Sequence, residues 1–259
     1  MPNDIRLFGF SMHDAKPLTG ELADIVSKTP NDIIVVSFGS MGGKLPVKYV
    51  NKLLDTFERL NHTVIFSYSG DVTTFAKPPP SNVFLLPWLP QNDILGYNKT
   101  KLFITHCGHN GQSEALYHGV PMINMPLYFE QFHNAFRVQD HEFGITVNIH
   151  DFTVDSLYNA IQEVMMNPKY QFNVQRASRI VRSQREPKKV AADWIEHVME
   201  FGGDHLRSAA FDMPWYQYFM LDILGLVIVV IIMFVSICVC VLKKLYTFVF
   251  KSPSKYKKE

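Results

Sequence analysis

One stretch of the chain, Ile223 to Leu242, contains twenty residues without a formal charge (ILGLVIVVIIMFVSICVCVL). A helix rises about 1.5 Å per residue, so a helix of this length covers roughly 30 Å, the thickness of a bilayer's hydrocarbon core. A helix this uniformly apolar is rare in the core of a soluble domain. We therefore expect residues 223–242 to form one transmembrane helix.

The charges that flank this run are asymmetric. Six lysines follow it, against a single acid, Glu259: Lys243, Lys244, Lys251, Lys255, Lys257 and Lys258. The positive-inside rule predicts that the tail of residues 243–259 is cytosolic and that everything before the span lies across the membrane. Residues 202–222 are rich in aromatic side chains. They are typical of an interfacial belt, or of a segment that packs beneath the folded domain.

The part of the chain before the tail is slightly acidic. The sequence has 25 basic and 24 acidic residues, and removing the six tail lysines and Glu259 leaves a net charge of about −4. Nucleic acid is therefore not expected as a partner. Only Cys107 precedes the span, which excludes an intrachain disulfide in the body. Residues 1–20 lack the basic start and apolar core of a signal peptide, so we expect the chain to be the C-terminal portion of a longer protein.

Strand-like and helix-like patterns alternate between residues 32 and 201. Apolar runs typical of buried strands occur at 32–38, 63–68, 82–86, 102–105, 121–125 and 144–149. Helical spacing occurs at 46–60, 111–118, 131–139, 154–166, 170–182 and 190–201, with a short helix after Asp93. This alternation predicts an α/β fold with a doubly wound parallel sheet, in a domain of residues 32–201 that follows a lead-in of residues 1–31. Ligands of such sheets bind beyond the carboxyl ends of the strands.

The densest run of aromatic and polar groups lies between Trp88 and Gln131. One strand there ends in THCGHNG, residues 105–111, and leads into a helix. Small residues at such a junction let a ligand approach the backbone, and the free N–H groups of the helix start can bind phosphate oxygens. Asn110 can cap this helix. Glu114 lies one turn further along the same face, where a carboxylate can accept two hydrogen bonds from a diol such as ribose.

Groups on either side of this junction suit the remaining parts of a nucleotide sugar. Trp88 offers a flat ring on which a base can stack, and Gln91 offers an amide held by a proline-stiffened turn. Glu130 and Gln131 follow the next strand and can bond sugar hydroxyls at the same edge. Taken alone, the 106–110 segment would be read first as an ordinary histidine, a turn glycine and a helix cap, and only its neighbours favour a ligand site.

Other chemistries fit this sequence less well. His106, Cys107 and His109 would need a fourth ligand to bind zinc. The turn at 39–43 (GSMGG) has neither the G-x-G-x-x-G spacing nor the lysine of a P-loop, and no G-x-S-x-G elbow is present. We therefore expect no dinucleotide, ATP or hydrolase site and no metal.

The run WLPQNDILGYNKTKLFITHCGHNGQSEALYHGVPM, followed by FEQFHNA, resembles the donor-binding signature of the UDP-glycosyltransferases. It is most similar to that of the membrane-bound UDP-glucuronosyltransferases of animals. The likeness extends from about Ile33 to the membrane span and is confined to the C-terminal half of that family. It implies a GT-B fold, in which two Rossmann-like domains face each other across a cleft and the second binds UDP-sugar.

The resemblance also implies roles for individual residues. Trp88 would stack on uracil, Gln91 would bond the base or ribose, and Glu114 would bind the ribose hydroxyls. The diphosphate and sugar would be held by a larger set: His106, Gly108, Asn110 and Gly111 with Ser40 for the diphosphate, and Glu130 and Gln131 for the sugar. Family members more often carry Asp in place of Glu130. The donor sugar therefore stays open between glucuronic acid, the first choice, and glucose.

The catalytic base of this family is a histidine oriented by an aspartate in the N-terminal domain. Residues 1–31 contain no match, since His13 and Asp14 are adjacent and not spaced as in the family. No catalytic residue is therefore assigned. The resemblance implies the donor-binding half of a hexosyltransferase that moves a sugar, with inversion, from UDP to small lipophilic acceptors bound by the other domain. UDP-sugar, with UDP-glucuronate as the first choice, would be a co-substrate, and no cofactor is expected.

The alternative is a non-catalytic membrane form that binds UDP-sugar or modulates full-length partners. Homo- and hetero-oligomers are both compatible with the sequence. The final residues, KYKKE, resemble the dilysine signal that returns membrane proteins to the endoplasmic reticulum, although lysines facing anionic lipid give the same pattern. The sequons at Asn61 and Asn98 agree with a lumenal body. We expect a single-pass protein of the endoplasmic reticulum membrane.

Overall fold

The computed structural model of the chain describes residues 12–39 and 45–250. These residues divide into two compact units, a sheet domain that ends at Trp194 and a C-terminal segment that begins at Ile195. Each unit is described separately below.

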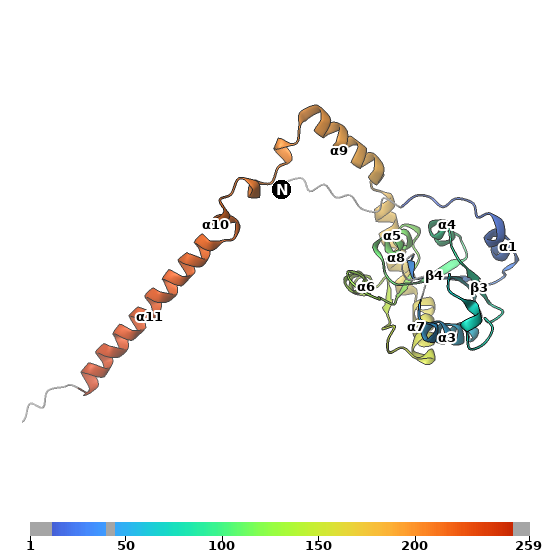
Figure 1. Cartoon of the computed structure of the whole chain (residues 1–259), viewed down its shortest axis with the longest axis horizontal. Helices are drawn as coiled ribbons and strands as arrows, with labels where there is room; N and C mark the ends of the chain where they lie inside the picture. The colour runs from blue at the N-terminus through green and yellow to red at the C-terminus, as the bar shows by residue number, and fades with distance from the viewer. Residues whose placement is uncertain (1–11, 40–44, 251–259) are drawn as a thin grey trace, which may run out of the picture. The chain divides into compact units, whose positions relative to one another are not determined.

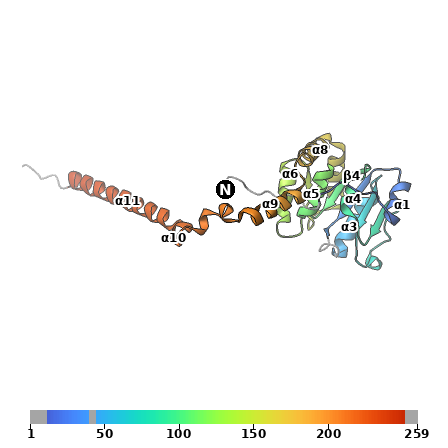
Figure 2. The same ribbon diagram turned by 90° about the horizontal axis from the view of Figure 1, so that it is seen from above.

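The sheet domain is built on six parallel strands (Figures 1 and 2). The spatial order is β3-β2-β1-β4-β5-β6, and each neighbouring pair is parallel. The strands are β1 (Ile33–Ser37), β2 (Thr63–Ser67), β3 (Val83–Leu86), β4 (Thr100–Thr105), β5 (Met122–Asn124) and β6 (Gly144–Thr146). All five residues of β1 are buried, as its continuous apolar run predicts for a central strand covered on both faces.

Helices cover both faces of this sheet (Figure 1). On one face, α3 (Val47–Glu58) and α7 (Val154–Met166) bury side chains such as Leu53, Phe57 and Ile161 against the strands. The other face is covered by α1 (Gly20–Lys28), α4 (Gln91–Leu95), α5 (His109–His118) and α6 (Gln131–Asp140). The helix α8 (Pro168–Arg182) packs beside α5, and α9 (Pro187–Phe201) follows it. The predicted doubly wound α/β fold is confirmed.

The order of strands reverses between β1 and β4. From β1 the chain first builds outward through β2 to β3, and then returns to place β4 on the other side of β1. A crevice forms at such a point, because the loops that leave the two strands run to opposite sides. The loops after β1 and β4 therefore flank the expected position of a ligand.

Among the predicted helix starts that were wrong, two belong to α4 and α5. The helix expected from Gly111 begins at His109, and its N-cap is Gly108, so Asn110 is a residue of the first turn and not the cap. The short helix expected after Asp93 begins at Gln91, with Pro90 at its N-cap. In both cases the backbone turns into a helix before the first apolar residue, where hydrophobic spacing gives no signal.

The C-terminal segment contains short helices and one long helix. It includes η2 (Asp204–Leu206), η3 (Ala209–Phe211), α10 (Trp215–Tyr218) and α11 (Leu221–Phe250). The apolar run 223–242 lies wholly inside α11, and residues Leu221–Phe248 are long and apolar enough to cross a membrane. An 18-residue window within this range has a mean hydropathy of 3.3, and none of that window is buried within the chain, which is compatible with a single-pass anchor. The tail from Lys251 onward lies outside the described residues.

Candidate functional site

The imidazole ring of His106 lies at the point where the strand order reverses. It follows β4 and sits between two glycines, Gly39 after β1 and Gly108 before α5. A Cβ atom at Gly39 would lie 2.7 Å from Cε1 of His106, and one at Gly108 would lie 2.4 Å from its Nε2. Any side chain at either position would displace the ring. Gly39 also has a φ of +70°, which favours glycine on its own account.

Burial keeps the His106 side chain neutral. It lowers the pKa of the imidazole below its usual value of 6.5, although the nearby backbone of Ser37 and the charge of Glu130 act in the opposite direction. Within the described part of the chain, Nδ1 of His106 is buried without a hydrogen-bond partner. A neutral imidazole carries one N–H donor and one acceptor nitrogen.

The backbone is strained where β4 turns into α5. Cys107 is fully buried and has a φ of +64°, a left-handed conformation that costs a non-glycine residue about 1–3 kcal/mol. The turn is held by Thr105, whose Oγ1 accepts from the Cys107 N–H at 3.2 Å, and by Asn134 of α6, whose Nδ2 donates to the Cys107 carbonyl at 3.1 Å. This turn aims the start of α5 at the crevice.

The start of α5 is suited to an anion. Its N-cap, Gly108, has no side chain and therefore makes no side-chain capping bond to the first turn. Such N–H groups, together with the helix dipole, attract phosphate or carboxylate. Asn110 is exposed on this first turn.

Gln91 and Glu114 form a polar pair between α4 and α5. The Nε2 amide of Gln91 donates to Oε2 of Glu114 at 2.7 Å. Gly111 allows this approach, because a Cβ atom there would lie 3.1 Å from the same nitrogen. Burial raises the pKa of Glu114, while the hydrogen bond from Gln91 opposes that effect. The pair presents a half-buried carboxyl group one turn beyond the anion site.

Trp88 lies on the loop between β3 and α4 and is 73% exposed. The next residue, Leu89, is 5% exposed and anchors the loop to the core beneath the sheet. A large flat ring left in solvent on an anchored loop is available for stacking.

The acid-amide pair at 130–131 has two different environments. Glu130 is exposed and forms the N-cap of α6, whereas Gln131 is 4% exposed. Oε1 of Gln131 accepts from the N–H of Leu127 at 2.9 Å and of Tyr128 at 3.2 Å, so this oxygen shapes the β5–α6 loop. Phe129 in the same loop has a φ of +53° and is 84% exposed.

The structure gathers the described residues of the predicted site along the carboxyl edge of β3, β4 and β5. Ser40 lies outside the described residues. No group of three His, Cys, Asp or Glu side chains that could hold a metal occurs in residues 12–39 and 45–250. His13 and Asp14, which were given no catalytic role, contact α4, α5 and α8.

Sequence reasoning missed the supporting residues of this edge. Asn134 holds the strained turn, and Gly39 makes room for the His106 ring. Asn92 bonds α4 to the backbone carbonyl of His13. The position of Asn134 could have indicated this role, because it is a polar residue on the same buried face of α6 as Ala135 and Val138. Such a residue must find a partner in the interior.

The chain matches the family model described as "UDP-glucoronosyl and UDP-glucosyl transferase" over residues 1–256. It is 39% identical over 233 residues to UDP-glucuronosyltransferase 1A7 of Mus musculus, and 38% identical over 233 residues to UDP-glucuronosyltransferase 1A9 of Homo sapiens. Each alignment covers 89% of this chain and 43% of the relative, so the chain spans less than half the length of these relatives.

Solved structures share the fold at low sequence identity. The crystal structure of Os79 from O. sativa in complex with UDP aligns with a TM-score of 0.61 and 20% identity, over 69% of this chain and 43% of that one. The calicheamicin glycosyltransferase CalG4 aligns with a TM-score of 0.60 and 22% identity, over 67% and 44%. With the family match over nearly the whole sequence, these findings show that the chain belongs to the UDP-glucoronosyl and UDP-glucosyl transferase family and has the fold of one GT-B domain.

Proposed function

We propose that the sheet domain binds UDP-sugar in the crevice between β1 and β4, as the membrane-anchored donor half of a UDP-glucuronosyltransferase. The observation that carries this proposal is the order of groups along the carboxyl edge. An exposed Trp88 comes first, then the Gln91–Glu114 pair, then the uncapped start of α5 beside His106. Uracil, ribose and diphosphate follow one another in the same order.

The diphosphate site needs no metal under this proposal. The first-turn N–H groups of α5 and the neutral His106 ring supply donors, and the helix start adds roughly half a positive charge. The same groups would stabilise the charge that develops on UDP as it leaves. Addition of a chelator should therefore leave UDP affinity unchanged, and a loss of binding that Mg²⁺ restores would contradict this part of the proposal.

The proposed reaction transfers the sugar, with inversion, to the hydroxyl of a small lipophilic acceptor. A general base outside the sheet domain would take the acceptor proton. Glucuronic acid is the proposed sugar and glucose the second candidate, with Glu130 exposed at the loop where the sugar would lie. The span of α11 would anchor the protein in the endoplasmic reticulum membrane, with the sheet domain in the lumen and the lysine-rich tail in the cytosol.

Nucleotide binding can be tested by calorimetry with UDP and the full chain in detergent micelles. Replacing Trp88 by Ala should weaken binding about 5- to 150-fold, because stacking contributes roughly 1–3 kcal/mol per base. The matched control is Trp215→Ala, since Trp215 is 68% exposed in the C-terminal segment. Equal affinity in both variants would refute the stacking role. A folded wild-type chain that does not bind UDP would refute the donor site.

Turnover is a separate question. Release of UDP is measured from UDP-glucuronate, and then from UDP-glucose, with a simple phenol as acceptor. Binding without turnover would support a donor half that needs a second domain. Measurable turnover by this chain alone would overturn the assignment of the base to another domain.

A further inference from the structure

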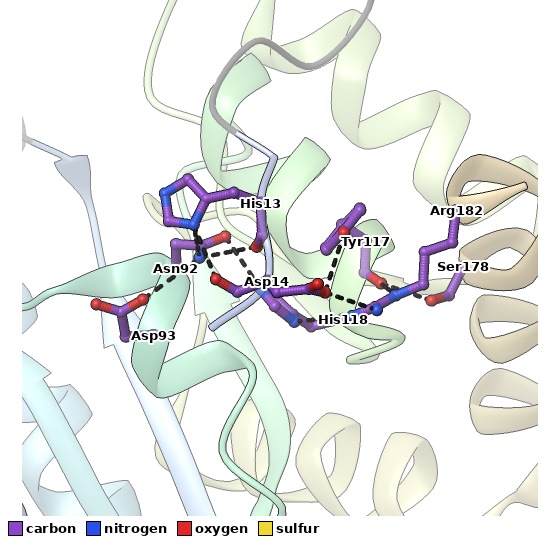
Figure 3. Close-up of polar contacts among 8 residues, drawn as sticks. All are labelled: His13, Asp14, Asn92, Asp93, Tyr117, His118, Ser178 and Arg182. Atoms are coloured by element: carbon purple, nitrogen blue, oxygen red, sulfur yellow. Dashed lines mark hydrogen bonds and ion pairs between the residues drawn. The ribbon is translucent and has the colours of Figure 1, made fainter. Parts of the chain in front are cut away.

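Residues 13–16, here called the N-terminal strap, lie across α4 (Figure 3). The N–H of Lys16 donates to Oδ1 of Asp93 at 2.9 Å, and Nδ2 of Asn92 donates to the carbonyl of His13 at 3.1 Å. Asn92 is only 8% exposed, so its amide is committed to these contacts. Two successive residues of α4 are therefore bonded to the strap.

Close packing fixes the other end of α4. Gly96 is the C-cap of this helix, and a Cβ atom there would lie 2.4 Å from Cβ of Ala15 and 2.8 Å from Cε1 of His118. The φ of Gly96 is −80°, which any residue adopts, so space and not backbone conformation requires a glycine. The strap thus touches both ends of a helix of five residues.

The strap is in turn fixed to α5 and α8 (Figure 3). Oδ1 of Asp14 accepts from the hydroxyl of Tyr117 at 3.1 Å and from Nη1 of Arg182 at 3.0 Å. Nε of Arg182 donates to the Tyr117 carbonyl at 2.9 Å, and the Ser178 hydroxyl donates to the same oxygen at 2.5 Å. Asp14 therefore joins the strap to the end of α5 and to the last turns of α8.

His118 completes a second connection to α4. Its Nε2 lies 3.0 Å from Oδ1 of Asn92, and its Nδ1 lies 3.5 Å from Nη2 of Arg182. Because the guanidinium can only donate, Nδ1 must accept, and Nε2 then carries the proton that it donates to Asn92. Burial and the charge of Arg182 lower the pKa of His118 to about 4, so the ring is neutral near pH 7.

These contacts meet α4 at Asn92, Asp93 and Gly96. The helix begins at Gln91, whose amide binds Glu114, and Asn92 is the next residue. We propose that the strap positions α4, so that UDP affinity depends on Asp14, Asn92 and Gly96, although none of them would contact the nucleotide. This inference rests on the proposed donor site and adds positioning residues to it.

Two variants test this positioning role against one matched control. Asp14→Ala removes the bonds to Tyr117 and Arg182, and Gly96→Ala pushes Ala15 away from α4. The control is Asp155→Ala, because Asp155 forms the same kind of exposed ion pair with Arg59, between α7 and α3. Both strap variants should weaken UDP binding about 2- to 30-fold, the range expected for coupling through packed contacts, while the control should bind as the wild type does.

A second measurement separates positioning from a general loss of stability. Binding and strap ordering must be reciprocal, so saturating UDP should slow hydrogen exchange at the Lys16 N–H, which the ligand would not touch. Asp14→Glu, which keeps a carboxylate, should recover part of the affinity lost in Asp14→Ala. UDP binding with wild-type affinity in both strap variants, or unchanged exchange at Lys16, would overturn the strap's role and leave the donor site intact. Failure of the folded wild type to bind UDP would overturn both.

Discussion

The side-chain amide of Gln91 lies 2.7 Å from the carboxylate of Glu114, and Gly111 leaves the space that this contact needs. The bond joins the first residue of α4 to the middle of α5. Gln91 directly follows the loop that carries Trp88, and Glu114 belongs to the helix whose start faces the proposed diphosphate. The pair therefore connects the proposed base-binding and phosphate-binding groups.

Replacing Glu114 by Gln should separate stability from binding. Burial raises the pKa of Glu114 above its usual 4.5, so the ionised form destabilises the folded state. That cost is absent below pH 4.5 and appears as the pH rises through the folded-state pKa. Glu114→Gln should therefore be more stable than the wild type at pH 7 and equally stable below pH 4.5. Thermal unfolding between pH 4 and 8 measures the difference.

The same variant should bind UDP more weakly. Hydrogen bonds to a charged group contribute about 1.5–3 kcal/mol, so the loss at pH 7 should be about 10- to 150-fold. Wild-type affinity should also fall as the pH is lowered toward 4.5, whereas the affinity of Glu114→Gln should change less. Calorimetry at several pH values gives both curves. Parallel curves would show that the Glu114 carboxylate does not bind the ligand.

Gly108→Ala should destabilise the domain through the His106 ring. The backbone of Gly108, with φ −64° and ψ 146°, accommodates alanine, but the new Cβ would lie 2.4 Å from Nε2 of His106. We expect a cost of about 1–3 kcal/mol from overpacking, in addition to the smaller cost of alanine at an N-cap. In a His106→Ala background only the N-cap cost should remain. A double-mutant cycle on the free energy of unfolding isolates the difference. Equal costs in the two backgrounds would show that the ring moves aside freely.

His118 should make the domain sensitive to acid. Its pKa is lowered from 6.5 to about 4 in the folded state. The neutral ring therefore contributes stability that is fully present above pH 6.5 and is lost as the pH falls from 6.5 toward 4. His118→Gln keeps an amide that can donate to Asn92, and it should make unfolding less dependent on pH in this window. An unchanged pH profile would show that protonation of His118 is not part of acid unfolding.

Glycosylation tests the proposed lumenal orientation. Asn61 and Asn98 are exposed in the loops before β2 and β4, at the amino edge of the sheet and opposite the proposed donor site. Thr63 and Thr100 of these sequons are buried, so glycans must be added before the domain folds. In a eukaryotic secretory system both sites should carry glycans that an endoglycosidase removes. Asn61→Gln and Asn98→Gln should each lose one glycan and keep UDP affinity. A wild-type chain without glycans would contradict the lumenal body.

Periodic patterns predicted the elements of the sheet domain well where local sequence decides the structure. The helix α7 begins and ends at the predicted residues, and a capping box of Thr153 and Ser156 fixes its start. The helix α8 begins at Pro168, two residues before the predicted Tyr170, because Asn167 caps it and proline suits the first turn. The capping residues of both helices are polar, so the spacing of apolar residues, on which the prediction depends, does not include them.

The site was less predictable because distant residues decide its geometry. Cys107 adopts a left-handed conformation that its own sequence disfavours, and Asn134, 27 positions later, holds it there. The sequence predicts that Gln131 binds the sugar together with Glu130, yet Oε1 of Gln131 accepts hydrogen bonds from the backbone of its own loop. Binding of the sugar by the Nε2 amide of Gln131 stays a prediction. Contacts of this kind depend on the assembled fold and have no period in the sequence.

The buried Cys107 also gives the domain a chemical property unrelated to binding. Burial raises the pKa of its thiol to about 12, and the thiolate is the form that reacts with alkylating agents and oxidants. Cys107 is the only cysteine that precedes α11 in this sequence, so its side chain should remain a stable free thiol in an oxidising compartment. Its alkylation requires the β4–α5 turn to open. The rate of labelling at this one atom therefore measures how often the junction beside His106 comes apart.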